Sequence, residues 1–371
     1  MATKIAINGF GRIGRLALRA VIESGRRDID VVAINDLGSA KFNAHLLQYD
    51  SVHGTLSKKV SSRKSSIRIG NKSIKIFAEK NPEDLPWSDL GIDIVMECTG
   101  IFTSKEKAQM HLKAGAKRVL ISAPATNADI TVVYGVNHKK IRKSHKIISN
   151  ASCTTNCLAP VAKVLDKVCG INQGYMTTVH AFTGDQSILD SLHSDERRAR
   201  ASSVSMIPSS TGAAKAVGLV LPQLQGRLDG TAIRVPTPNV SMIDLVFNSK
   251  KKIDTDTINK AMINASKGEL KGVLGVEDKP LGKINIVNHS GRSNEAQEQA
   301  NYRGIGLAEM IDAIENNRMH RCNGELALHV LDVIECAMIS SIYKVEVELR
   351  SSCVKPEPMH DDFIRQILKK I

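Results

Sequence analysis

Aromatic residues and long apolar runs are both scarce in this chain of 371 residues. Only 4% of the residues are aromatic, and Trp87 is the single tryptophan. No apolar stretch approaches the roughly 20 residues that a membrane-spanning helix needs. The N-terminal residues Met1 to Lys4 lead directly into a strand-like segment, so we expect no signal peptide. These absences predict a cytoplasmic protein.

The cysteines form no CxxC pair. There are seven: Cys98, Cys153, Cys157, Cys169, Cys322, Cys336 and Cys353. Because many zinc sites use such pairs, we expect no metal centre. An odd number of cysteines in a cytosolic chain favours free thiols. One of these thiols is therefore a candidate for a reactive group.

The formal net charge of +13 is compatible with binding to nucleic acid. However, lysines and arginines are spread along the chain, and no aromatic platform motif accompanies them. The triplet Lys250 to Lys252 is the longest basic run noted. We therefore expect a surface that attracts phosphorylated metabolites, with neither nucleic acid nor membrane as a partner.

The chain divides by pattern into three parts. Residues 1–150 alternate short apolar runs (4–8, 30–35, 92–97, 118–122, 131–135 and 146–149) with helical segments, which predicts an α/β domain with a doubly wound parallel Rossmann sheet. Residues 151–281 carry strand patterns at 175–181, 231–235 and 241–247 and helical patterns at 210–221 and 254–268. This part predicts an α+β catalytic domain with a mainly antiparallel sheet. Residues 282–371 form an atypical C-terminal segment with helical patterns at 304–317 and 324–341.

A glycine-rich turn marks a dinucleotide site. Gly9, Gly11 and Gly14 form a GxGxxG sequence that follows a predicted strand and opens a predicted helix, the context that the motif requires. Such glycines let the backbone approach a pyrophosphate, which the helix N-terminus then binds. Asp36 closes the second predicted strand, where a carboxylate can bind ribose hydroxyls. This acid favours NAD over NADP, because it would repel a 2′-phosphate.

The stretch 149–157, SNASCTTNC, contains the candidate nucleophile. Cys153 follows a strand and precedes a helical segment, so the helix N-terminus should stabilise its thiolate and hold a developing oxyanion. Cys157, one turn further, should share the helix face but lie deeper, as a core cysteine. Among eleven histidines, His180 is the best placed base, because it ends the predicted strand that begins at Tyr175.

Residues 1 to about 281 resemble the type I phosphorylating glyceraldehyde-3-phosphate dehydrogenases. The resemblance is carried by INGFGRIGR at 7–15, SNASCTTNCLAP at 149–160, STGAAKA at 210–216 and RVPTPNVS at 234–241. It implies that Cys153 attacks the aldehyde and that His180, the general base, takes the hydroxyl proton as hydride leaves for the nicotinamide. Inorganic phosphate then attacks the thioester to give 1,3-bisphosphoglycerate, a step of glycolysis and gluconeogenesis. The resemblance also implies a homotetramer.

The resemblance assigns further residues to the ligands. It implies that substrate phosphate and attacking phosphate are bound by Ser152, Thr154, Thr183, Arg197, Thr211, Gly212 and Arg234. For NAD the matching residues are Arg12, Ile13, Asp36, Lys80 and Ser122. The loop from Asp190 to His193 lacks the Leu-Pro of many NAD-specific members, which leaves partial use of NADP open. An erythrose-4-phosphate dehydrogenase and a non-catalytic NAD-binding hybrid are the alternative functions.

The C-terminal quarter departs from this family. The family's tryptophan-containing motif cannot be present there, because Trp87 is the only tryptophan. The missing segment carries the asparagine that orients the nicotinamide carboxamide, together with strands of the catalytic sheet. Residues 302–310, 317–321 and 324–332 instead resemble the C-terminal tail of the glucose–fructose oxidoreductase and inositol dehydrogenase family, without its catalytic lysine. His320 and His329 are interpreted as structural. A genuine fusion and a recombination or assembly error would both give such a chain, and both would expose a sheet face unless the tail covers it.

Overall fold

A computed structural model describes residues 2–277 and, beyond them, residues 316, 318, 328–329, 332–333, 335–336, 339–340 and 345–352. The chain divides into two compact units, Met1–Glu277 and Asp278–Ile371. The sheets and the candidate site described below all lie in the first unit. Within the described residues, no helix has the length and apolar character needed to cross a membrane.

The N-terminal half of the first unit is built on a nine-stranded sheet with the order β10-β11-β9-β8-β1-β2-β7-β6-β5. Its strands are β1 (Thr3–Asn8), β2 (Ile29–Asn35), β5 (Val60–Arg63), β6 (Ser66–Ile69), β7 (Lys72–Phe77), β8 (Ile94–Glu97), β9 (Arg118–Ile121), β10 (Ile130–Thr131) and β11 (Ile147–Ser149). The seven strands from β10 to β7 are parallel to one another, and β7, β6 and β5 are antiparallel. The prediction of a doubly wound parallel sheet is confirmed.

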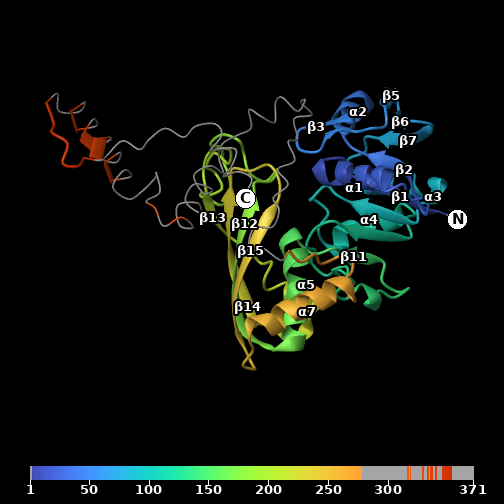
Figure 1. Cartoon of the computed structure of the whole chain (residues 1–371). Coiled ribbons are helices and arrows are strands. Elements are labelled where there is room, and N and C mark those ends of the chain that lie inside the picture. The colour runs from blue at the N-terminus through green and yellow to red at the C-terminus, as the bar shows by residue number, and fades with distance from the viewer. Residues whose placement is uncertain are drawn as a thin grey trace. The chain divides into compact units, whose positions relative to one another are not determined.

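Helices and short elements surround this sheet (Figure 1). They are α1 (Arg12–Glu23), α2 (Ala40–Gln48), α3 (Trp87–Leu90), α4 (Lys105–Lys113), the small hairpin β3 (Tyr49–Asp50) and β4 (Gly54–Thr55), and the 3₁₀ turns η1 (Pro82–Asp84) and η2 (His138–Lys140). Alternate residues of β1 serve opposite layers, because side chains alternate along a strand. Ile5 and Ile7 join one core cluster, and Ala6 joins another around Trp87. Both faces of the sheet are thus covered, as a parallel sheet requires.

The strand predicted at 131–135 is shorter in the structure, where β10 ends at Thr131. A turn replaces its second half, because the Val133 N–H donates to the Asn137 side chain at 2.8 Å and Gly135 has a φ of +83°.

The helix predicted at 210–221 is also largely wrong. Ser210 ends a strand that pairs with Thr231, so ladder pairing overrides the helical pattern there.

The second half of the unit contains a four-stranded sheet with the order β13-β14-β12-β15. Its strands are β12 (Ile171–Ala181), β13 (Ile207–Ser210), β14 (Leu228–Val235) and β15 (Ser241–Ser249). β12 pairs in parallel with β14, whereas the other two pairings are antiparallel, which confirms the mainly antiparallel sheet. The helices are α5 (Cys153–Val168), α6 (Val217–Val220), the 3₁₀ turn η3 (Pro222–Leu224) and α7 (Thr255–Lys267).

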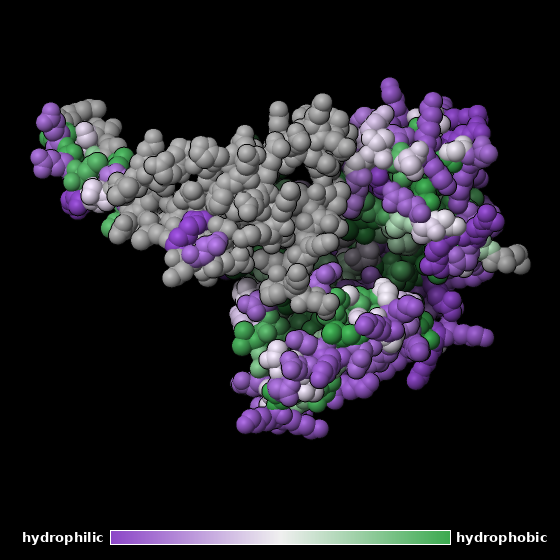
Figure 2. Space-filling model, viewed as in Figure 1, coloured by the Kyte–Doolittle hydropathy of each residue, from purple (hydrophilic) through white to green (hydrophobic). Residues whose placement is uncertain are grey.

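One face of this sheet packs against the helices, and the other carries exposed apolar side chains. Leu158, Ala162 and Leu165 of α5 share a core with Met176 of β12 and Leu228 of β14, and α5 and α7 lie on that side of the strands (Figure 1). On the opposite face, Tyr175, Met242 and Val246 are 52%, 60% and 69% exposed. In Figure 2, apolar surface is visible over the described strands of this sheet and the helices beside them, with hydrophilic residues at its lower end.

The described residues of the second unit include part of the predicted helix 324–341, at 328–329, 332–333, 335–336 and 339–340. The Asp332 carboxylate accepts the backbone N–H groups of Arg350 and Ser351 at 2.7 and 2.8 Å. The Ser351 hydroxyl also donates to it and lowers the pKa of Asp332 to about 2. His329 Nδ1 lies 3.1 Å from the Ser351 carbonyl. Apart from single positions, the helix predicted at 304–317, His320 and the stretches 302–310, 317–321 and 324–332 lie outside the described residues.

Candidate active site

A cleft of about 520 Å³ lies at the carboxyl edge of the N-terminal sheet, where β1, β2 and β8 end. Ligands of open α/β sheets bind at such an edge. The cleft is lined by Asn8, Gly9, Gly11, Asn35, Asp36, Leu37, Glu79, Lys80, Cys98, Thr99, Ile101 and Phe102. The sheet therefore brings the glycine turn and Asp36 together, although they lie on different strands.

The glycine turn is shaped for close approach of a ligand. Gly9 has a φ of +86°, and a Cβ there would lie 2.7 Å from the Thr99 backbone nitrogen. A Cβ on Gly14 would lie 2.2 Å from the Gly9 carbonyl oxygen, so only glycine lets α1 pack this close to the turn. Gly11 precedes α1 without a side-chain cap, and no acidic residue lies in the first turn. The first N–H groups of α1 are thus available for an anion.

Asp36 is held against the same turn. Its Oδ2 accepts the Phe10 N–H at 2.8 Å, and its Oδ1 accepts the Gly38 N–H at 2.8 Å and Asn43 Nδ2 at 3.2 Å. The carboxylate is thereby fixed at the cleft wall with lone pairs left for hydroxyl groups. These features fit a dinucleotide, with the pyrophosphate at the α1 N-terminus and a ribose at Asp36.

The other residues predicted for the cofactor lie around this cleft. Lys80 lines it. Arg12 and Ile13 lie in the first turn of α1, where Arg12 approaches Asp50 at 3.4 Å and Ile13 is 55% exposed. Ser122 follows β9 and hydrogen-bonds the Cys98 thiol, whose pKa burial raises to about 11. Burial thus disfavours the thiolate form of Cys98, which lies in the cleft wall.

Cys153 is the first residue of α5, directly after the N-cap Ser152. The Ser152 hydroxyl accepts the Thr155 N–H at 3.0 Å, which orients the first turn. Ala151 has a φ of +56°, an uncommon conformation for a residue with a Cβ, at the bend from β11 into the helix. This bend presents the sulfur at the helix N-terminus.

The Cys153 sulfur lies 3.1 Å from Nε2 of His180, near the end of β12. The hydrogen bond from His180 is the main cause that lowers the pKa of the Cys153 thiol, with Thr154 assisting. The same contact raises the pKa of His180. Both shifts favour the thiolate–imidazolium pair, the form in which a cysteine is nucleophilic near neutral pH.

Arg234 stands beside His180 across the β12–β14 ladder. His180 Nδ1 lies 2.7 Å from the Ala181 carbonyl, and Arg234 Nη1 lies 3.0 Å from the same oxygen. In the imidazolium form Nδ1–H donates to this carbonyl, so the 2.9 Å separation of Nη1 and Nδ1 is a contact between two donors. A bound anion would offset the crowding of positive charge around Arg234.

The sulfur faces a cavity of about 240 Å³ that is rich in hydrogen-bond donors. It is lined by Ser152, Cys153, Thr154, Thr178, His180, Arg198, Ser210, Thr211, Gly212, Ala213, Ala232 and Arg234. Burial lowers the pKa of Arg234. Thr178 Oγ1 and Arg234 Nε are buried and have no hydrogen-bond partner among the residues that the structure describes. Unsatisfied buried donors of this kind fit an anionic ligand.

The cavity collects five of the seven residues predicted for the anions, namely Ser152, Thr154, Thr211, Gly212 and Arg234. Thr183 is exposed outside its lining. Arg197 also points elsewhere: its side chain is 57% exposed and pairs with Asp195 at 3.1 Å.

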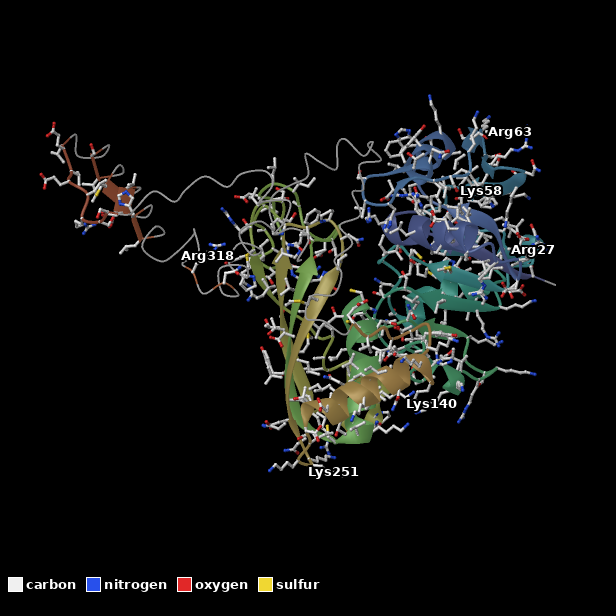
Figure 3. All side chains as sticks on the ribbon, in the orientation of Figure 1. Arg27, Lys58, Arg63, Lys140, Lys251 and Arg318 are labelled. Atoms are coloured by element: carbon white, nitrogen blue, oxygen red, sulfur yellow. The ribbon has the colours of Figure 1, made fainter. Side chains whose placement is uncertain are left out.

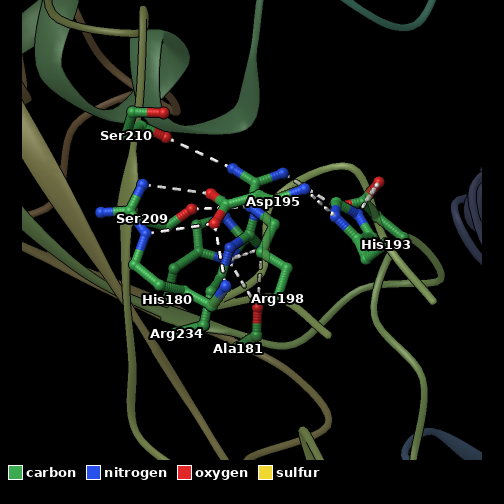
Figure 4. Close-up of polar contacts among 10 residues, drawn as sticks. His180, Ala181, His193, Asp195, Arg198, Ser209, Ser210 and Arg234 are labelled. Carbon is green, nitrogen blue, oxygen red and sulfur yellow. Dashed lines mark hydrogen bonds and ion pairs between the residues drawn. The ribbon is translucent and has the colours of Figure 1, made fainter. Parts of the chain in front are cut away.

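Arg198, which the sequence reasoning missed, lines the cavity instead. It donates to Ser209 Oγ at 2.7 Å, to Asp185 at 2.8 Å and to the Ser210 carbonyl at 3.3 Å (Figure 4). Two adjacent arginines give the same sequence signal, and only the path of the loop decides which one turns inward.

Cys157 corrects another prediction, because it is exposed rather than buried in the core. It does share a helix face with Cys153, as four-residue spacing requires. That face looks away from the core, which α5 fills with Leu158, Ala159 and Ala162. The pKa of the Cys157 thiol is raised, by partial burial of its sulfur and by the Cys153 charge.

Comparison with known proteins agrees with both halves of this site. Residues 3–105 match the model of the glyceraldehyde 3-phosphate dehydrogenase NAD-binding domain, and residues 152–311 match the model of the C-terminal domain of the same family. A glyceraldehyde-3-phosphate dehydrogenase of Xanthobacter flavus is 60% identical over 294 residues, which cover 79% of this chain and 88% of that protein. The chain belongs to the glyceraldehyde-3-phosphate dehydrogenase family.

Other relatives support this assignment. Proteins of the same name from Cereibacter sphaeroides and Geobacillus stearothermophilus are 60% and 56% identical, each over 76% of this chain and 84% of their own length. NAD is thus the cofactor of the dinucleotide cleft. The family match continues to residue 311 and so overlaps the stretch from 302 for which the sequence alone predicts a different origin.

Replacing Arg198 and Arg197 in turn distinguishes the two arginines. We expect Arg198→Leu to raise the KM for the anionic substrates by roughly 10-fold or more, because a charged hydrogen-bond donor contributes about 1.5–3 kcal/mol. Arg197→Leu removes an exposed pair with Asp195 and should change KM by less than about 2-fold. Steady-state kinetics with glyceraldehyde 3-phosphate and with phosphate as varied substrates measures both. Equal effects of the two changes would contradict the placement of Arg198.

Proposed function

We propose that this protein catalyses the NAD-dependent oxidative phosphorylation of glyceraldehyde 3-phosphate to 1,3-bisphosphoglycerate through a thioester on Cys153. The observation that supports this most directly is the 3.1 Å pair of Cys153 and His180 at the mouth of a donor-rich cavity. A cysteine at a helix N-terminus next to an imidazole is an activated nucleophile. The nearby arginines suit a substrate and a co-substrate that both carry phosphate.

The geometry assigns each protein group a task in the first half of the reaction. The Cys153 thiolate forms a bond to the aldehyde carbon, and the carbonyl oxygen gains the negative charge. Backbone N–H groups at the α5 N-terminus stabilise this charge. The His180 imidazolium gives its proton to this oxygen, and neutral His180 takes the proton back as the carbon is oxidised. When bound, NAD supplies the hydride acceptor for this oxidation.

The second half is a transfer of the acyl group to phosphate. A phosphate oxygen attacks the thioester carbon, and the carbon–sulfur bond breaks. The leaving thiolate is stabilised by His180, which is again protonated, and by the helix N-terminus. Arg198, Arg234 and Thr211 line the same cavity as Cys153 and would hold the anions while this occurs.

The direct test follows NADH absorbance with glyceraldehyde 3-phosphate and NAD, in the presence and absence of phosphate. NADH formation that depends on phosphate is the expected result. Faster turnover of erythrose 4-phosphate, with release of the acid and no need for phosphate, would contradict the proposed substrate. Stoichiometric NAD binding by the folded chain without turnover would contradict an enzyme and indicate a non-catalytic hybrid.

Asp36 should determine the choice of cofactor. We expect Asp36→Asn to raise the Kd for NAD by roughly 5- to 10-fold, because an amide is a weaker partner of ribose hydroxyls than a carboxylate. The same change should narrow the preference over NADP, since it removes the charge that repels a 2′-phosphate. Titration of both cofactors into the wild type and the variant measures this. An unchanged ratio of the two Kd values would show that another residue selects the cofactor.

We also propose that the chain forms homotetramers. Large apolar side chains are exposed along the loop that carries Arg198 and at the edge of the catalytic sheet: Ile188, Leu189, Leu192, Val204, Met206, Val240, Met242 and Val246. Exposed apolar side chains in this number favour contact with a second copy. The basic side chains labelled in Figure 3 do not gather into one patch, because they project from different parts of the first unit: Arg27, Lys58, Arg63, Lys140 and Lys251. Sedimentation equilibrium at micromolar concentration would contradict the proposal if it gave a monomer.

The C-terminal tail and the cellular location are further parts of the proposal. We infer that residues 302–332 derive from an oxidoreductase-like tail that replaces the family's last segment. Substitution of residues 282–371 by a family-type C-terminus should then raise kcat, and an unchanged kcat would argue against the replacement.

We propose a cytoplasmic location, because the cysteines whose state is described are all free thiols. Cell fractionation that finds the protein outside the cytoplasm would exclude this.

A further inference from the structure

Four polar side chains are buried beneath the dinucleotide cleft and take no part in the proposed chemistry. Asn8 and Glu97 are each 1% exposed, and His111 and Trp87 are fully buried. They come from β1, β8, α4 and α3, so the fold gathers them from four separate elements. Burying a carboxylate and an imidazole is costly unless both are hydrogen-bonded. Their partners therefore indicate what the cluster does.

The hydrogen bonds of the cluster have one consistent direction. Trp87 Nε1 lies 3.0 Å from His111 Nδ1, and an indole N–H can only donate. His111 Nδ1 therefore accepts, and the proton of the neutral ring is on Nε2. This Nε2–H donates to Glu97 Oε2 at 3.0 Å. The tryptophan thus determines the histidine tautomer, and the histidine in turn presents a donor to the carboxylate.

The Glu97 carboxylate is fully satisfied by donors. Asn8 Nδ2 donates to Oε2 at 2.6 Å, and the Thr99 N–H and hydroxyl donate to Oε1 at 2.7 and 2.5 Å. Both oxygens of the Glu97 side chain are therefore occupied as hydrogen-bond acceptors within the cluster. The 3.3 Å contact between Asn8 Nδ2 and His111 Nε2 joins two donors that both face the same oxygen.

The chain of hydrogen bonds ends at the floor of the cleft. Asn35 Nδ2 donates to Asn8 Oδ1 at 2.8 Å, and Asn8, Asn35 and Thr99 all line the cleft. Thr99 also presses on the glycine turn, because a Cβ on Gly9 would lie 2.7 Å from its backbone nitrogen. Phe102, another lining residue, packs edge-on against His111 with ring centroids 6.2 Å apart.

We propose that Trp87, His111 and Glu97 form a positioning relay for the cofactor: they hold Asn8 and Thr99 on either side of Gly9 and so set the shape of the cleft that binds NAD. The inference deepens the proposed function and rests on NAD binding, not on the chemistry at Cys153. Loss of any link leaves a buried donor or acceptor unpaired. Without His111, the Glu97 carboxylate keeps only Asn8 and Thr99 as donors. It then settles with them in a different position and shifts the glycine turn.

The test compares His111→Leu with His111→Gln. Leucine offers neither donor nor acceptor, whereas glutamine can accept from Trp87 with its carbonyl and donate to Glu97 with its amide. We expect His111→Leu to raise the Kd for NAD roughly 10-fold and His111→Gln to restore most of the affinity. The KM values for glyceraldehyde 3-phosphate and phosphate, and kcat at saturating NAD, should stay near those of the wild type. Binding is measured by calorimetry, so the result does not depend on activity.

The single tryptophan gives a second readout, because Trp87 is part of the relay and the only indole in the chain. Its emission without cofactor should shift to shorter wavelength in His111→Leu, where the indole loses its acceptor, and return in His111→Gln. Ile92→Ala is the matched control. Ile92 is 1% exposed in the same core cluster as Trp87 and contributes only packing. It should lower the melting temperature and leave the Kd for NAD unchanged.

The outcomes separate a positioning role from a merely structural one. Equal loss of melting temperature in His111→Leu and Ile92→Ala, with NAD affinity unchanged in both, would overturn the relay. Equal weakening by leucine and glutamine would overturn it too. Should His111→Leu fail to fold, Glu97→Gln tests the same link. The single amide NH2 of glutamine meets either the donors of His111 and Asn8 or those of Thr99, and NAD affinity must fall in both cases. A wild-type chain that does not bind NAD would contradict the proposed function itself.

Discussion

Replacing Cys153 by serine is expected to lower kcat by on the order of 10⁴-fold or more, the largest effect of any single change in this chain. A serine hydroxyl is not ionised near neutral pH, so it cannot exploit the imidazolium of His180 or the α5 N-terminus as the thiolate does. The substitution removes no packing, because the side chain is exposed to the cavity. NADH formation with glyceraldehyde 3-phosphate measures the loss, and an unchanged melting temperature shows that the fold is intact.

Cys157→Ser provides the matched control for this substitution. Cys157 lies one turn further along the same helix, is also exposed, and has a pKa that is raised rather than lowered. Its replacement should leave kcat within about 2-fold of the wild type. If Cys157→Ser lost activity and Cys153→Ser kept it, Cys157 would be the nucleophile and the proposed thioester on Cys153 would be rejected.

His180→Asn should remove the low-pKa thiolate and lower kcat by about 10²–10⁴-fold. The hydrogen bond from His180 is the main cause of the lowered pKa of Cys153, so its loss moves that pKa up toward the ordinary thiol value. A depressed thiol pKa means that the thiolate is present above it and is lost as the pH falls through it. In the variant, thiolate should therefore form only at higher pH.

The rate of Cys153 alkylation by iodoacetamide as a function of pH measures this shift. Below its pKa the thiol is mostly protonated, so a pKa that rises in the variant should slow alkylation near neutral pH. The rate should recover in alkaline solution. His53→Asn is the control, because His53 is exposed and far from Cys153 in the sequence. It should keep the wild-type dependence of alkylation rate on pH. An unshifted profile in His180→Asn would mean that the helix N-terminus alone activates the thiol.

The dinucleotide site could be predicted largely from local sequence. Gly9 and Gly14 are required by contacts within a few residues or with the next loop, and the strand-turn-helix context makes that requirement visible as a motif. Asp36 could be placed because parallel strands end at one edge of a sheet. The same local logic placed Cys153 at a helix N-terminus, since a strand, a turn and a helix follow each other directly there.

Errors arose where long-range contacts decide the conformation. Ser210 belongs to a strand because Thr231 pairs with it, and no local pattern indicates that partner. Arg198 faces the cavity and Arg197 faces solvent because Asp185 and Ser209 hold the former. Cys157 is exposed because it lies on the same face of α5 as Cys153, and that face does not pack against the core. In each case a long-range contact decides which side chain or segment faces the core, the cavity or solvent. Neighbouring residues of similar chemistry do not reveal that contact in the sequence.

The sequence by itself determined the family motifs, the parallel sheet with its glycine turn, and the place of the candidate nucleophile at a helix N-terminus. These depend on backbone geometry and on residues close in the chain. Only the tertiary structure decided the pairing of Cys153 with His180 at 3.1 Å, the choice of Arg198, and the relay from Trp87 through His111 to Glu97. The physical reason is the short range of hydrogen bonds. A polar side chain acquires its role from the few atoms within about 3 Å of it, and folding brings those atoms from distant parts of the chain.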